Sequence, residues 1–221
     1  MKRTSLRIIK VLGLIICFLA MVASASFYLG YWYYYQYQAE RQSIRSLERD
    51  FSRLEKKLKQ AVKFYPLPLF YLELGRLRLE RAMAEIEFGL PEKSEPYLDQ
   101  AREAIEKAVS GNPLDYSSFW ELSKVYFLYN YPLLTYAEKG RMLCREAVKR
   151  HPHNEFLNLN VLIIFFEQWP LLEPEEKDWV RSQIAFLQAA DFGFVAKLKR
   201  KWQQNYRETA SIERRLKEIG F

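Results

Sequence analysis

The hydrophobic pattern divides the chain into one continuous apolar run near its start and a long region of amphipathic periodicity behind it. Residues 11–39 carry no charged side chain. Further along, apolar residues recur at intervals of three and four, with Lys, Arg, Glu and Asp between them. This is the period of an α-helix with one buried face. The pattern predicts an all-α protein in which a long apolar helix precedes several amphipathic ones.

The apolar run is long enough to cross a membrane, since about 20 helical residues span the hydrocarbon layer. Four basic residues precede it, namely Lys2, Arg3, Arg7 and Lys10. Basic residues beside a span favour the cytoplasmic side. We therefore expect residues 1–38 to form a cytoplasmic N-terminus and a single transmembrane signal-anchor helix. The protein would lie in the plasma or inner membrane, with the bulk of the chain extracytoplasmic.

Eight aromatic residues follow within the stretch from Phe27 to Tyr37. Trp and Tyr prefer the headgroup zone of a bilayer, because their rings are part apolar and part polar. The expected membrane-interface residues are Tyr31, Trp32, Tyr33, Tyr34 and Tyr35. A cleaved signal peptide, giving a secreted protein cut near Ala25, is the alternative. The apolar run continues past that position, which favours the uncleaved anchor.

Residues 39–65 are predicted to form an amphipathic stalk helix. Their apolar residues recur every three or four positions, at Ile44, Leu47, Phe51, Leu54, Leu58 and Ala61. This stripe suits a short coiled coil that dimerises the protein beside the membrane, and a homo-oligomer is therefore an open alternative. The favoured interpretation is that the helix packs its stripe on the rest of the chain.

Three segments of the chain end in the same way, with an alanine, a valine and, five residues after the alanine, a proline. They are LKQAVKFYP at 58–66, AREAIEKAVSGNP at 101–113 and GRMLCREAVKRHP at 140–152. A larger apolar residue stands three positions before each alanine. A small residue lets a helix approach its neighbour closely, and proline stops it before the next helix begins. This self-similarity predicts stacked helical hairpins.

The helices between these segments carry aromatic and leucine residues at helical spacing. The positions are Leu74-Gly75 after the first proline, and Phe119, Leu122 and Tyr126 after the second. Here the chain resembles the tetratricopeptide repeat (TPR) family, over roughly residues 54–190, with Arg78 where a second aromatic is expected. The resemblance implies a short α-solenoid of TPR-like hairpins over residues 66–190.

In the resembled family, the first helices of the hairpins line a groove that binds peptide segments. The residues that the resemblance places in this groove are Arg76, Leu79, Trp120, Lys124 and Phe127. A groove of basic and apolar groups suits a peptide with acidic and apolar residues. Helical spacing alone leaves open a different placement, in which Leu79, Trp120 and Phe127 belong to the core.

The C-terminal segment, residues 191–221, is basic. From residue 195 it has eight Lys or Arg against three Glu, in a chain with a net charge of +7. We expect basic capping helices here, since a terminal repeat needs a polar outer face. The alternative is an anionic surface binder built around Trp202 and Tyr206.

The sequence contains no glycine-rich phosphate loop, HExxH, CxxC or nucleophile elbow. Its two histidines, His151 and His153, lie in one loop. We therefore expect no enzyme, no cofactor and no metal, and nucleic acid is not an expected partner. The expected function is a membrane-anchored adaptor or scaffold that binds a protein or peptide partner at the extracytoplasmic face. It would be an accessory subunit of an envelope, secretion or polysaccharide assembly. The alternative is a structural subunit that oligomerises through its transmembrane and stalk helices, without a groove ligand.

Overall fold

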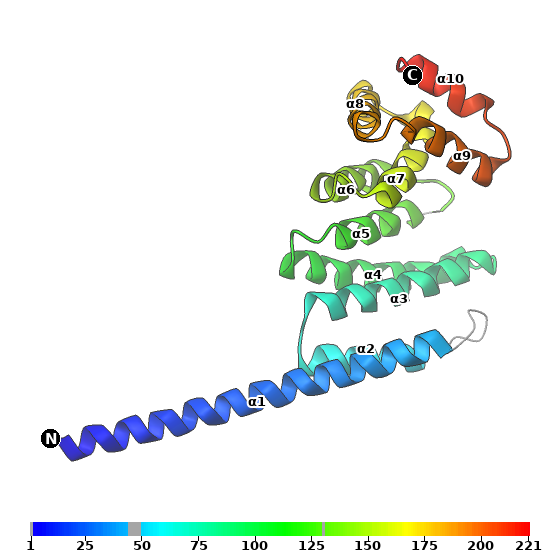
Figure 1. The fold of residues 1–221 in the computed structure, drawn as a ribbon. Helices are drawn as coiled ribbons and strands as arrows, with labels where there is room; N and C mark the ends of the chain where they lie inside the picture. The colour runs from blue at the N-terminus through cyan, green and yellow to red at the C-terminus, as the bar shows by residue number, and fades with distance from the viewer. Residues whose placement is uncertain (1, 44–49, 130) are drawn as a thin grey trace. The chain divides into compact units, whose positions relative to one another are not determined.

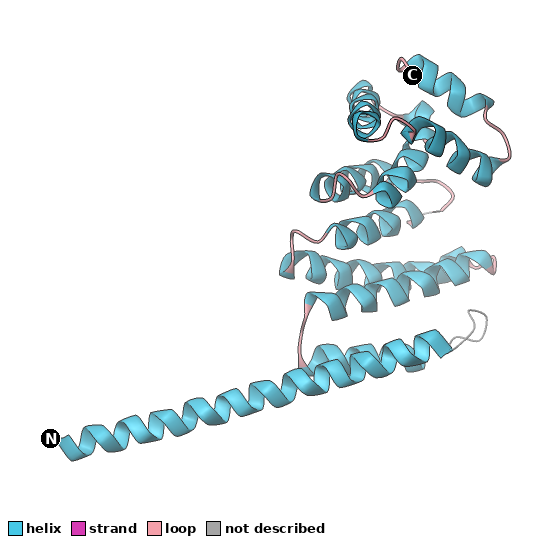
Figure 2. Ribbon diagram, in the orientation of Figure 1, coloured by secondary structure: helices cyan, strands magenta, loops and turns pink. Residues whose placement is uncertain are grey.

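The computed structural model describes residues 2–43, 50–129 and 131–221, with the backbone alone for residues 2–10 and 43. Every regular element in this part of the chain is a helix, as Figure 2 shows. The predicted all-α class is confirmed. The chain forms two compact units, Met1–Gly140 (unit 1) and Arg141–Phe221 (unit 2), which are described separately.

Helix α1 (Lys2–Ser43) is the long apolar helix that the sequence predicts. Its segment Val11–Gln42 is long and apolar enough to cross a membrane. Figure 1 shows the N-terminal half projecting away from α2 and α3, and residues 11–25 are all exposed. A candidate membrane span is therefore present, and the direction in which it crosses stays a prediction.

Helix α2 (Phe51–Phe64) lies beside the C-terminal half of α1 (Figure 1). Of the residues expected in one stalk helix, 39–65, residues 39–43 belong to α1 and residues 51–64 form α2, which Asp50 caps, while 44–49 lie outside the described residues. Folding back buries the apolar stripe of α2 against the aromatic face of α1. Leu54, Leu58 and Ala61 are fully buried, as the inward-packing interpretation requires. Ile44 and Leu47 lie outside the described residues.

Helices α3 (Pro68–Glu87) and α4 (Pro91–Gly111) form a hairpin, and each begins with a proline in its first turn. A Cβ added at Gly75 would lie 2.3 Å from Cγ1 of Ile105, so α3 and α4 meet closely at this glycine. Ala101, Ile105 and Ala108 are fully buried. The small-residue pattern of the sequence therefore marks the contact face of this hairpin.

Helix α5 (Tyr116–Leu128) begins where the Asp115 carboxylate accepts hydrogen bonds from the backbone N–H groups of Ser117 and Ser118. Such a side chain satisfies N–H groups that the first helical turn leaves unpaired. Helix α6 (Ala137–Arg150) follows. Gly140 lies against the Phe127 ring, since a Cβ added there would be 2.5 Å from Cε1.

Unit 2 continues with four α-helices and a short 3-10 helix. They are α7 (Glu155–Glu167), η2 (Trp169–Leu171), α8 (Pro174–Ala190), α9 (Phe194–Tyr206) and α10 (Ala210–Glu218). Helix α9 buries Phe194, Leu198 and Trp202, while Tyr206 stays exposed. Trp202 is therefore a core residue and is not available to an anionic surface. Both helices of the basic segment are amphipathic, as a capping pair would be.

Candidate functional site

Unit 1 has a hollow of about 260 Å³ over α1, α3 and α5, which we name the charged hollow. Three of the predicted groove residues line it, namely Arg76, Leu79 and Lys124. Arg41 from α1 completes the wall, together with Glu80, Met83 and Glu121. Residues that are far apart in sequence thus converge on one surface of the unit.

Arg76 lies between two carboxylates in this hollow. Its Nη1 donates to Oε1 of Glu73 at 2.7 Å, and its Nε donates to Oε1 of Glu121 at 3.2 Å. Burial by itself lowers the pKa of the Arg76 guanidinium, but attraction to Glu121 and Glu73 outweighs it and raises the pKa. Arg76 is therefore a permanent cation held by α3 and α5 together.

Helix α1 joins the same network through Arg41 and Tyr37. Nη1 of Arg41 donates to Oε2 of Glu73 at 2.9 Å and to the Tyr37 hydroxyl at 2.7 Å. The second amino group of Arg41 donates to Glu80. Because charge-assisted hydrogen bonds are strong when partly buried, these contacts hold the end of α1 on α3.

The charges of the hollow are paired. Arg41, Arg76 and Lys124 face Glu73, Glu80 and Glu121, and Lys124 Nζ lies 2.9 Å from Oε2 of Glu121. Arg76 and Lys124 are more exposed than their partners, since the Arg76 side chain is 28% exposed against 7% for Glu73, and that of Lys124 is 35% exposed against 10% for Glu121. Arg41 and Glu80 are almost equally exposed, at 24% and 23%.

The five predicted groove residues differ in their burial and contacts. Leu79 is buried and forms part of the wall of the hollow. Trp120 is half-buried and is not among the lining residues of the hollow, but Nζ of Lys124 lies 5.1 Å from its ring centroid. Phe127 packs on Gly140 of α6 instead. Sequence reasoning missed Arg41 and Glu121, although a carboxylate three residues before Lys124 is a recognisable signal.

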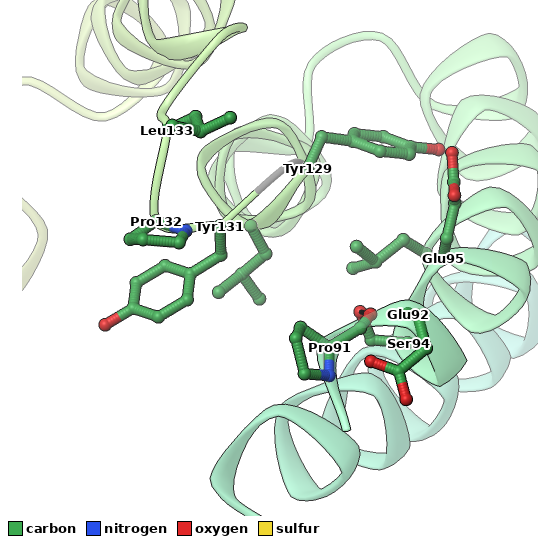
Figure 3. A pocket seen from close by; sticks show the side chains of 10 residues that line it. Pro91, Glu92, Ser94, Glu95, Tyr129, Tyr131, Pro132 and Leu133 are labelled. Carbon is green, nitrogen blue, oxygen red and sulfur yellow. Dashed lines mark hydrogen bonds between the residues drawn. The ribbon is translucent and has the colours of Figure 1, made fainter. Parts of the chain in front are cut away.

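A second hollow, of about 450 Å³, lies between the start of α4 and the segment that follows α5, and we name it the apolar hollow (Figure 3). Pro91, Leu98, Tyr131 and Leu133 contribute apolar surface. Glu92 and Glu95 add carboxylates to its lining. Sequence analysis did not single out this site, because its residues come from a turn and a helix start that carry no motif.

The predicted interfacial aromatics of α1 divide between two environments. The Tyr34 ring lies 4.9 Å from Phe70 and the Tyr33 ring stacks on Phe64 at 5.6 Å, measured between centroids. Tyr31 meets the edge of Phe70 at 5.3 Å but keeps an exposed side. The remaining two, Trp32 and Tyr35, are exposed. Part of the aromatic stretch is therefore packed on α2 and α3, and part is free to meet a bilayer.

Among the residues described, no group of three or more His, Cys, Asp or Glu side chains could hold a metal ion. His153 packs its ring on Phe186, with 5.1 Å between the centroids. No protein-family model matches the sequence, and a search of curated proteins finds no match.

Proposed function

We propose that this protein is a membrane-anchored adaptor of TPR-like helical hairpins, which holds a protein or peptide partner beside the membrane. The observation that carries the proposal is the charged hollow. Arg76, Leu79 and Lys124, which the TPR resemblance places in a groove, come from α3 and α5 and line one surface with Arg41. An accessory subunit of an envelope, secretion or polysaccharide assembly needs such an anchored docking surface.

The partner is a segment that carries acidic and apolar side chains. Its carboxylates would approach Arg76 and Lys124, which are more exposed than Glu73 and Glu121, and Arg41, which is more exposed than Glu73. An apolar side chain would lie against Leu79 and Met83 in the same hollow. Complementary charge of this kind contributes mainly to specificity and to the rate of association.

The test is photo-crosslinking in cells with a light-activated amino acid at Met83, which lines the charged hollow. The matched control carries the same amino acid at Glu103, an exposed position on α4. A protein adduct at Met83 and none at Glu103, identified by mass spectrometry, would support the adaptor and identify its partner. A third position, Leu133, tests the apolar hollow. Adducts at Leu133 alone would move the binding site there, and no adduct at either hollow would contradict the proposal.

The extracytoplasmic position of the bulk of the chain is part of the proposal and rests on the basic residues before the span. A cysteine at Glu103, in a Cys17→Ala background, can be treated in intact cells with a thiol reagent that does not cross membranes. Cys144 is buried and leaves little background. We expect labelling at the new cysteine. Labelling only after the cells are opened would place this domain in the cytoplasm.

The competing function is a subunit that oligomerises through α1 and the stalk stripe. Fewer exposed apolar residues of the stripe support it. Leu54, Leu58 and Ala61 are fully buried within unit 1, so the α2 part of the stripe is occupied within the chain. Light scattering of the detergent-solubilised protein distinguishes the two, because an oligomer built on α1 alone would still exceed the monomer mass.

A further inference from the structure

We propose that one edge of unit 1 lies directly on the lipid bilayer, as a second membrane contact beside the anchor. This edge consists of the α2–α3 turn, the α4–α5 turn and the exposed apolar residues Leu69 and Leu114. We name it the lipid edge, and its partner is the headgroup layer of the membrane that α1 crosses. The inference rests on the membrane anchor of the proposed function.

The first step is that α1 enters the domain without a linker. It is one α-helix from Lys2 to Ser43. Gly30 is the first residue of α1, counted from Val11, that is buried. A Cβ added at Gly30 would lie 2.8 Å from Cβ of Tyr65 and 3.3 Å from the carbonyl oxygen of Ala61. The end of α2 therefore packs directly on α1 at this point.

The second step concerns length. A helix needs about 20 residues to cross the hydrocarbon layer. Counted from Val11, the first uncharged residue after Lys10, that length ends near Gly30. The outer end of the span and the first packed residue of unit 1 thus coincide. Phe27 already contacts the domain, with its ring centroid 5.2 Å from that of Tyr65. Tyr65 lies at the start of the α2–α3 turn, so this turn is at headgroup level.

The third step is the direction of the edge. Figure 1 shows the α2–α3 and α4–α5 turns of unit 1 on the side toward which the free half of α1 projects. The two turns also touch, since a Cβ added at Gly111 would lie 2.7 Å from Cγ of Pro68. The edge therefore continues sideways from the point where α1 leaves the bilayer.

The fourth step is the chemistry of the edge. Leu69 is exposed in the first turn of α3, and Leu114, in the α4–α5 turn, is 81% exposed. Lys63, exposed in the last turn of α2, can reach lipid phosphates. Tyr28 and Trp32 are exposed on α1 close by. Apolar side chains beside a cation and interfacial aromatics are the composition of a surface that lies in the headgroup zone.

The apolar hollow supplies an internal comparison. It lies at the start of α4 and beyond the end of α5, which is the opposite end of both helices from the lipid edge (Figure 1). Leu133, which lines this hollow, is 79% exposed, closely matching Leu114. Two leucines of closely similar exposure thus lie on opposite edges of unit 1, and the inference predicts that only Leu114 has access to lipid.

The experiment uses the full chain, with Cys17→Ala, reconstituted into phosphatidylcholine–phosphatidylglycerol vesicles that contain a lipid with a nitroxide on its headgroup. One added cysteine, at Leu114, Leu133 or Tyr28, carries an environment-sensitive fluorophore, and the native Cys144 is buried. We expect the lipid nitroxide to quench the fluorophores at 114 and 28 strongly and the one at 133 little. Circular dichroism of each variant checks that the helices are intact.

Two results would overturn the inference, and they are distinguishable. If the fluorophore at 28 is quenched and those at 114 and 133 are equally unquenched, the anchor is inserted but the lipid edge stands away from the bilayer. If the fluorophore at 28 is also unquenched, α1 does not enter the membrane, and the proposed anchor fails together with the lipid edge.

Discussion

Arg78 of α3 donates a hydrogen bond from Nε to Oε1 of Glu55 on α2, at 3.0 Å, and the same guanidinium reaches a third helix. Its Nη1 donates to the backbone carbonyl of Gln100 on α4, also at 3.0 Å. The side chains of Arg78 and Glu55 are largely buried, at 13% and 15% exposure. Arg78 stands where the TPR pattern expects an aromatic, and here it links α2, α3 and α4 through polar contacts instead.

The first prediction follows from this linkage. Arg78→Ala leaves the Glu55 carboxylate and the Gln100 carbonyl without their Arg78 partner, and should lower the free energy of unfolding of unit 1 by about 3 kcal/mol. Arg102→Ala, on the more exposed face of α4, should cost below about 1 kcal/mol. Hydrogen exchange of α2 and α4 peptides in the full chain measures both. Equal losses in the two variants would show that the linkage contributes little.

The second prediction concerns acid. Burial by itself raises the pKa of Glu55, but the hydrogen bonds from Lys59 and Arg78 outweigh it and hold the pKa below the usual 4.5. A depressed folded-state pKa stabilises the fold above the unfolded value, and this stabilisation is lost as pH falls through the folded value. Unit 1 should therefore lose stability below about pH 4.5. Glu55→Gln should be less stable at neutral pH and show a shallower acid limb, measured by thermal unfolding. An unchanged limb would exclude Glu55 as a contributor.

The third prediction tests the close contact of α3 and α4. In an open helix Gly→Ala stabilises by roughly 0.5–1 kcal/mol. At Gly75 the new methyl group would meet Ile105, so the hairpin must open or repack, at about 1–3 kcal/mol. Gly13→Ala, where a Cβ meets nothing within 4 Å, is the control and should leave unit 1 unchanged. Denaturant unfolding in detergent measures the stability of each variant. A Gly75→Ala variant more stable than the unmodified protein would contradict the prediction.

The fourth prediction is for unit 2. Nε of Arg141 donates to Oε1 of Glu176 at 2.9 Å, and its Nη1 donates to Oε1 of Gln168 at 2.9 Å. Both charged side chains are buried, so Glu176→Ala leaves an uncompensated cation and should cost about 3–5 kcal/mol. Hydrogen exchange should show the loss in α7 and α8. Lys197→Ala, which removes the surface ion pairs with Glu155 and Asp191 of unit 2, should change nothing measurable.

Several features of the fold were predictable because they depend on local pattern. The charge-free run 11–39 predicts the apolar helix α1, and the recurrence of Ala101 and Ala108 marks the face on which α4 packs. The prolines at 66, 113 and 152 also marked where α2, α4 and α6 end. In each case a single helix carries the whole signal, so tertiary partners were not needed to read it.

Other features depend on neighbours and could not be read locally. A helix with aromatic side chains all round has no amphipathic pattern to mark its packed side. The sequence therefore could not distinguish Tyr34, which packs on Phe70, from Trp32, which is exposed. The wall residue Arg41 was missed because the sequence places it in a stalk, and only the return of the chain through α2 brings it to α3.

Because α1 is one continuous helix from Val11 to Gln42, the rotation of its N-terminal half about the helix axis is coupled to the orientation of unit 1. A helix turns by about 100° per residue, so in a membrane-spanning α1 the side that faces a neighbouring helix would set the direction in which the charged hollow opens. One residue added between Val11 and Ser26 would rotate the hollow by about 100° around the helix axis and leave the packing among α2, α3, α4 and α5 unchanged. A partner that holds α1 within the bilayer would therefore also set the orientation of the domain.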